Sequence, residues 1–226
     1  MAGAVQLDVN FYGLGGHGST PEQTIDPIVM AANAILQYQT IISRNVHPQN
    51  PTVLTVGAIE AGIDNNVIPD KVLLKLNLRW YHRSDRDFMI ERIKKINEGI
   101  ALANNLPKEK YPTILIKQDL GVLDNDSALT AKVNSALEKM VGKGMNVITP
   151  PVMGSEDVQE LLRDHPHVPY NYFIVGIANR ELFAKALKEG KQFPFSNHNP
   201  DFWIDLAAIP LGTQFGLSAV LEVFQK

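Results

Sequence analysis

The chain has 226 residues, 45% of them hydrophobic and 20% charged, which is the composition of an ordinary globular protein of one large or two modest domains. A formal net charge of -3 argues against nucleic acid or an anionic membrane as partner, and no apolar run is long enough to span a bilayer. The lack of cysteine excludes disulfides, thiolate zinc ligands and a cysteine nucleophile. Because the start of the chain has no secretory signal pattern, we expect a cytoplasmic protein.

The first half of the chain predicts a small sheet with two helices. Residues 4–12 alternate between apolar and polar side chains, as in an antiparallel strand with one solvated face. After a glycine-rich loop at 13–19, the pair Asp26-Pro27 is typical of a helix start, and helical spacing carries this helix to about Ser43. The other predicted elements are strands at 52–59, 71–82 and 112–118, and a helix from Ser84 to Leu106, with Asp87 in an imperfect capping box.

This order of elements matches the split βαβ unit of a ferredoxin-like domain, in which four strands carry two helices on one face. We expect this α+β domain to occupy residues 1–118.

Residues 119–226 predict an α/β domain with too few strands. Helices are expected from Asp126 or Ser127 to Gly142, over 155–163 and over 206–224, and a short strand at 146–149. The apolar run 170–177 is typical of a strand that is buried on both faces of a parallel sheet. Because two strands do not make a stable doubly wound sheet, we expect this half to be an incomplete domain.

The segment Gly13–Gly18 fits the dinucleotide-binding pattern G-x-G-x-x-G, but its surroundings do not. A pyrophosphate-binding loop opens directly into a helix, whereas the predicted helix begins well beyond the last glycine. The preceding strand alternates instead of being apolar throughout, and no acidic residue follows at the expected distance. A nucleotide-binding oxidoreductase is therefore disfavoured, and the glycines are better interpreted as a flexible, exposed loop that presents His17.

Local sequence leaves two interpretations open for each polar candidate. His17 is either a surface histidine in a turn or a group that donates to a developing oxyanion. Asn66 belongs to an ordinary turn or reaches a substrate group. Arg79 is either solvated or suited to bidentate recognition of a carboxylate.

The second half adds two weaker candidates. Ser155, as the N-cap of a helix with acidic residues in its first turn, explains the segment Met153–Asp157 by capping alone. His198 lies in a polar loop before the last helix and could ligate a metal, although zinc needs three or four ligands. We interpret the remaining histidines as structural or solvated: His47, His82, His165 and His167.

Six short motifs, taken in order, resemble the aminoacylase/carboxypeptidase family of dinuclear-metal amidohydrolases, in the branch of hippurate hydrolases, N-acyl-amino-acid deacylases and indole-acetyl-amino-acid hydrolases. The motifs are Gly15-Gly16-His17-Gly18, Asp26-Pro27-Ile28, Ser43-Arg44, Asn66-Val67-Ile68-Pro69, Met153-Gly154-Ser155-Glu156-Asp157 and His198-Asn199-Pro200-Asp201-Phe202. Each is weak alone, and their shared order and spacing carry the resemblance. It implies a ferredoxin-like lid, in agreement with the pattern of residues 1–118, and the C-terminal portion of a catalytic domain over 119–226.

The resemblance also implies roles for these residues. It makes His17 a group that crosses a dimer interface and stabilises the oxyanion in the partner's active site. It makes Asn66 and Arg79 ligands of the substrate carboxylate, and His198 a metal ligand. The residues that would line the pocket are Gly154, Ser155 and Glu156.

The implied reaction is hydrolysis of the amide bond of N-acyl amino acids or small peptides. Two divalent ions (zinc, manganese, cobalt or nickel) would activate a water, and a glutamate would take its proton. The family's other metal ligands and its glutamate precede the lid, and no residues of this sequence match them. We therefore expect at most one metal ligand in this chain, a homodimer formed through the lid, and no activity of these residues alone. The alternative is a non-catalytic dimerisation or binding module with a ferredoxin-like fold.

Overall fold

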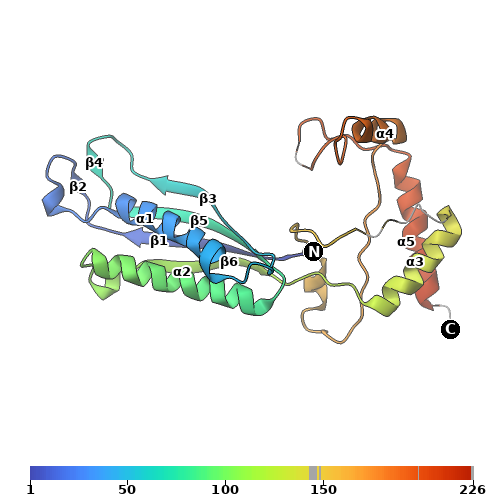
Figure 1. The fold of residues 1–226 in the computed structure, drawn as a ribbon, viewed down its shortest axis with the longest axis horizontal. Helices are drawn as coiled ribbons and strands as arrows, with labels where there is room; N and C mark the ends of the chain where they lie inside the picture. Colours follow the sequence, from blue (N-terminus) through green and yellow to red (C-terminus); the bar gives the residue numbers. More distant parts are fainter. Residues whose placement is uncertain (143–146, 148, 198, 225–226) are drawn as a thin grey trace. The chain divides into compact units, whose positions relative to one another are not determined.

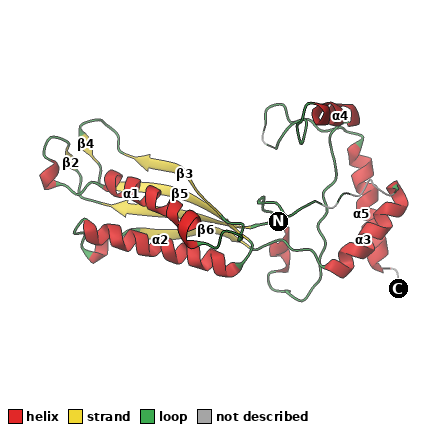
Figure 2. Ribbon diagram, viewed as in Figure 1, coloured by secondary structure: helices red, strands yellow, loops and turns green. Residues whose placement is uncertain are grey.

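The computed structural model describes residues 1–142, 147, 149–197 and 199–224, and its elements are shown in Figures 1 and 2. The chain forms two compact units. Unit 1 consists of Met1–Asp124 with Pro150–Asp164, and unit 2 of Asn125–Thr149 with His165–Lys226. Unit 1 thus takes in a segment that lies beyond the predicted domain boundary at residue 118.

Unit 1 is built on a four-stranded antiparallel sheet in the order β3-β5-β1-β6. Its strands are β1 (Gly3–Tyr12), β3 (Val53–Ala61), β5 (Lys71–Trp80) and β6 (Thr113–Leu120). The helices α1 (Pro27–Thr40) and α2 (Arg83–Ala103) both lie on one face of this sheet (Figure 2). The structure confirms the ferredoxin-like fold, and with it the mixed α/β class, that the sequence predicts.

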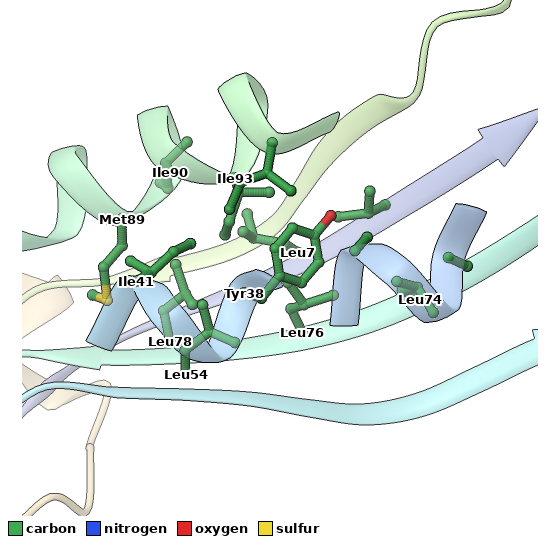
Figure 3. Close-up of a cluster of buried hydrophobic side chains, with 14 of the residues drawn as sticks. Leu7, Tyr38, Ile41, Leu54, Leu74, Leu76, Leu78, Met89, Ile90 and Ile93 are labelled. Carbon is green, nitrogen blue, oxygen red and sulfur yellow. The ribbon is translucent and has the colours of Figure 1, made fainter. Parts of the chain in front are cut away.

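The hydrophobic core fills the space between the sheet and the two helices (Figure 3). Because side chains alternate along a strand, β1 and β5 each turn one apolar row towards the helices. The buried members of these two rows are Val5, Leu7, Val9, Phe11, Val72, Leu74, Leu76, Leu78 and Trp80. The polar residues of the same strands lie on the opposite face, which α1 and α2 leave uncovered.

The ends of α1 and α2 test the capping predictions. Asp26 caps α1 as expected, since its carboxylate accepts a hydrogen bond from the Ile28 backbone N–H at 2.8 Å. A π-helical turn, η2 (Ile41–Asn45), prolongs α1 beyond the predicted end. The capping box predicted at Ser84 is wrong: α2 begins one residue earlier, and its N-cap makes no side-chain hydrogen bond. Asp87 is instead engaged by the guanidinium of Arg86.

Unit 2 is helical. The predicted helix α3 (Ser127–Val141) is capped by Asp126, whose carboxylate accepts from the Leu129 N–H at 2.7 Å, and it packs on α5 (Ala208–Phe224). The structure adds a helix that the sequence did not reveal, α4 (Arg180–Lys188). Its N-cap is Asn179, whose side chain accepts from two backbone N–H groups.

Two elements predicted in the second half differ from the structure. The run 170–177 is not a strand, because an extended segment becomes one only when a neighbour takes its backbone hydrogen bonds, and no strand among the described residues does so. The helix predicted over 155–163 is a short 3-10 helix, η4 (Val158–Leu162). The short strand predicted at 146–149 falls largely outside the described residues. No described helix is long and apolar enough to cross a membrane.

Candidate functional site

The glycine-rich segment 13–19 lies at one end of unit 1, the lid domain, beside residues 66–70. We call this end, made of both segments, the tip of the lid. Its strand β2 (Gly16–His17) pairs with β4 (Val67–Ile68), so that His17 lies opposite Val67. Leu14 bridges to Ile25 on the other side. The segment is exposed at residues 16–19, as predicted, but it is not an irregular loop, because backbone hydrogen bonds tie most of it to its neighbours.

The glycines are explained by close approach of backbone to backbone. A Cβ atom on Gly13 would stand 2.1 Å from the carbonyl oxygen of Ile25, and one on Gly15 would stand 2.8 Å from that of Ile68. Neither distance is tolerable for a real side chain. The glycines thus allow three chain segments to pack closely. Only a 3-10 turn, η1 (Pro21–Gln23), stands between them and α1 at Pro27, so no α-helix opens directly from the last glycine, as a dinucleotide-binding loop would require.

His17 is exposed and its ring is held by its own turn. The Nδ1 atom lies 3.1 Å from the backbone nitrogen of Ser19 and 2.7 Å from the Ser19 hydroxyl. The Thr20 N–H donates to the carbonyl of His17 at 3.0 Å, which closes the turn. This turn therefore engages the Nδ1 edge of the ring and leaves the Nε2 edge open.

Asn66 lies beside His17 at the same tip. Its carbonyl oxygen accepts a hydrogen bond from the Gly18 N–H at 2.8 Å, and its side chain is exposed. Two candidates that are far apart in the sequence are therefore adjacent, joined through the pairing of β2 with β4.

Arg79 lies at the other end of the lid. The strand β5 starts at Lys71, next to the tip, and Arg79 is eight residues further along, a span of about 27 Å. Asn66 and Arg79 therefore cannot bind one carboxylate within a single chain. The Arg79 guanidinium is half-buried, with Nε donating to the Asn77 side-chain oxygen at 2.7 Å and Nη1 donating to the Ser155 hydroxyl.

The segment that contains Gly154, Ser155 and Glu156 packs on this same end of unit 1. The Ala2 N–H donates to the carbonyls of Val152 and Gly154, at 3.1 and 3.0 Å. The Tyr81 hydroxyl donates to the Val152 carbonyl at 2.6 Å, and burial raises the pKa of this hydroxyl. Of the three pocket candidates, Ser155 and Glu156 are half-buried and Gly154 is exposed.

The described residues do not form a metal site. No group of three His, Asp or Glu side chains among them could hold an ion, and His198 lies outside the described residues. Since zinc needs three or four protein ligands, the described donors of this chain could not hold a dinuclear centre by themselves.

Sequence reasoning missed the residues that position the candidates. Ser19 holds His17, Asn77 holds the guanidinium of Arg79, and Tyr81 anchors the segment around Ser155. The spacing of Asn77 and Arg79 could have revealed their pairing, because residues two apart in a strand share one face. The long-range contact of Tyr81 leaves no such mark in the sequence.

Comparison with known proteins places this geometry in a family. Residues 2–105 match the peptidase dimerisation domain. The chain is 37% identical over 171 residues to an N-acetyldiaminopimelate deacetylase of Leuconostoc citreum, covering 74% of this chain and 42% of that protein. It is 36% identical over 157 residues to a hippurate hydrolase of Campylobacter jejuni, covering 70% of this chain and 40% of that protein. The chain spans about half the length of the curated relatives that it matches.

A solved structure supports the fold independently. A protein from methicillin-resistant Staphylococcus aureus aligns with a TM-score of 0.70 and 22% identity, covering 97% of this chain and 51% of that one. Taken with the ferredoxin-like lid and the paired tip that carries His17 and Asn66, these likenesses show that the chain belongs to the aminoacylase family of amidohydrolases.

Proposed function

We propose that this chain supplies the lid and part of the catalytic domain of an enzyme that cleaves the amide bond of N-acyl amino acids. The observation that carries the proposal is the tip, where His17 and Asn66 are exposed side by side at the pairing of β2 with β4. An N–H on an exposed imidazole can donate to the oxyanion of a tetrahedral intermediate, and an amide can bind a carboxylate. Relatives named for deacetylation and for hydrolysis of hippurate support this substrate class.

The reaction also needs a metal centre, which we propose is divalent and dinuclear, with His198 as one ligand. The other ligands and the base that activates water would come from residues outside this chain, so these residues alone would not turn over substrate. Several large apolar side chains of α5 are exposed, as expected if other residues of the catalytic domain pack against this helix in the whole enzyme. The most exposed of them are Ile209, Leu217 and Phe224, at 57%, 58% and 78%.

The cytoplasmic location stays a prediction.

A chimera tests the proposal. In it, this chain replaces the matching part of the Campylobacter jejuni hippurate hydrolase, and hydrolysis of N-benzoylglycine is measured. We expect turnover that a chelator abolishes, and His17→Ala should lower kcat by about 100- to 1000-fold, the usual effect of one lost oxyanion donor. His47→Ala, which alters another exposed histidine, serves as the control. A folded, active chimera whose rate ignores His17→Ala would contradict the proposal.

We further propose that the lid forms a homodimer through α1 and the edge of β3. The outer side of β3 has no partner strand among the described residues. Large apolar side chains surround this edge, with Val29 62%, Leu36 73% and Ile59 58% exposed. The other edge of the sheet, β6, carries Lys117 and Asp119, and charges of this kind discourage strand pairing.

Such a dimer would give separate roles to the two ends of the lid, which lie too far apart to bind one carboxylate within a single chain. Because Asn66 and His17 form one piece at the tip, both would reach the partner's active site together, while Arg79 would act at a different place. Leu36→Glu should convert the dimer to a monomer in analytical ultracentrifugation, and Leu102→Glu should not. Leu102 is a matched control because it is 66% exposed on α2. A wild-type chain that sediments as a monomer at high concentration would contradict the dimer.

A further inference from the structure

The ring of His17 has a defined hydrogen-bonding direction. A backbone N–H can only donate, so the contact of 3.1 Å from the Ser19 nitrogen makes Nδ1 an acceptor. The Ser19 hydroxyl, 2.7 Å from the same atom, must then donate as well. A neutral imidazole that accepts at Nδ1 carries its proton on Nε2.

The turn around the ring is fixed independently of Ser19's side chain. The Thr20 hydroxyl donates to the His17 carbonyl at 3.2 Å, beside the backbone bond from the same residue. On the opposite side, the Gly18 N–H is held by Asn66, and a Cβ on Gly18 would lie 3.3 Å from the Asn66 carbonyl oxygen. The backbone between His17 and Ser19 is therefore clamped, and the hydroxyl meets Nδ1 without further ordering of the chain.

We propose that Ser19 is a positioning residue that holds His17 in the tautomer with the proton on Nε2. This inference rests on the proposed function, in which His17 faces the substrate. With Nδ1 engaged and the proton on Nε2, the exposed edge of the ring is a hydrogen-bond donor and not a base. Ser19 thus selects oxyanion stabilisation over proton abstraction for this histidine.

A second histidine, His47, has the same backbone hydrogen bond to its ring but no hydroxyl beside it in its turn, and can therefore be compared with His17. His47 accepts at Nδ1 from the Gln49 backbone N–H at 3.2 Å, through the same two-residue turn. The corresponding residue there is glutamine, and no hydroxyl contact to the ring is present in that turn. His47 therefore shows the effect of the backbone donor alone on the tautomer of the ring. The difference in tautomer ratio between the two rings reports the effect of the Ser19 hydroxyl.

Long-range proton–nitrogen correlation spectra of the ring nitrogens test the proposal on the intact 226-residue chain, about two pH units above the ordinary imidazole pKa of ~6.5. The signals are assigned with His17→Gln and His47→Gln. We expect both rings to carry the proton on Nε2. In Ser19→Ala, the Nδ1 resonance of His17 should shift towards that of His47, and its ratio of Nε2–H to Nδ1–H tautomers should fall about fivefold, the effect of one ordinary hydrogen bond.

Ser19→Thr keeps the hydroxyl and should restore the wild-type spectrum, while the His47 signals stay constant throughout. A wild-type His17 protonated on Nδ1, or a Ser19→Ala spectrum identical to wild type, would overturn the proposal. The spectrum does not depend on turnover. A chimera whose rate ignores His17→Ala would instead defeat the proposed function and leave the tautomer assignment intact.

Discussion

The guanidinium of Arg79 donates a hydrogen bond to the hydroxyl of Ser155, a residue 76 positions further along the chain. This contact joins the end of β5 to a segment that the sequence places in another domain. The remaining guanidinium contact, to Asn77, fixes the direction in which Arg79 points. An arginine held in this way is preorganised, since its long side chain has already lost the freedom that binding would otherwise cost.

Ser155→Ala should loosen the segment 150–164 from the rest of unit 1. A hydrogen bond from a charged donor is worth about 1.5–3 kcal/mol, and half-burial places this one at the lower end. We expect faster amide hydrogen exchange over 150–164 and little change in α1 and α2. Ser43→Ala is the matched control, because the Ser43 hydroxyl donates only to the Gln39 carbonyl within its own helical turn. Unchanged exchange in Ser155→Ala would show that the contact does not hold the segment.

A polar pair inside the core of unit 1 makes a second prediction. The Tyr38 hydroxyl donates to the side-chain oxygen of Asn97, joining α1 to α2, and the Asn97 amide nitrogen has no partner among the described residues (Figure 3 shows Tyr38). Tyr38→Phe and Asn97→Leu should each cost about 1–3 kcal/mol, because each leaves a buried polar atom unpaired.

The double variant of Tyr38→Phe with Asn97→Leu should recover most of that loss, since both polar groups are then gone. Urea unfolding of the two single variants and the double variant measures the coupling. Tyr12→Phe is the control, since its hydroxyl contacts Thr113 at an exposed position. Strictly additive losses would contradict the pairing.

Burial of Tyr38 also predicts a pH dependence. Desolvation raises the pKa of its hydroxyl above the ordinary value of 10.0, and the bond to Asn97 only partly offsets this. The folded chain therefore keeps the proton at a pH where the unfolded chain has lost it. The stabilisation is complete below pH 10 and is lost above it, by about 1.4 kcal/mol per pH unit. Thermal unfolding from pH 9 to 11 should show a steeper decline for wild type than for Tyr38→Phe; equal slopes would contradict the shift.

The lid could be predicted because its signals are local. The alternation in β1 and β5 and the Asp26-Pro27 cap each decide their element without distant partners. The run 170–177 could not be placed in this way, because an apolar stretch does not state which strands will receive its hydrogen bonds. α4 was missed although Leu182, Phe183, Ala186 and Leu187 recur at helical spacing, because nine residues make a short helix that is easily overlooked between two loops.

In the candidate site, too, local features could be predicted from the sequence and long-range contacts could not. His17 and Asn66 were identified by the motifs, but their adjacency depends on the pairing of β2 with β4, and two-residue strands leave no periodic pattern. The distance of Arg79 from Asn66 follows from the length of β5, which the sequence did predict. That length, rather than the motif, separates the two carboxylate-binding candidates.

Two glycines in unit 1 give opposite predictions for the same substitution. Gly13→Ala places a methyl group 2.1 Å from the Ile25 carbonyl oxygen and 2.7 Å from the Pro27 ring, so the backbone must shift, at a cost of about 1–3 kcal/mol. Gly99→Ala meets nothing within 4 Å on the exposed side of α2, and alanine is the better helix former by about 1 kcal/mol. Denaturant unfolding should therefore show a loss for the first and a gain for the second. The Gly13 variant should also broaden or shift the ring signals of His17, because the tip is built on that packing; a stable variant with an unaltered tip would mean that the glycines are not needed to bring the three segments together.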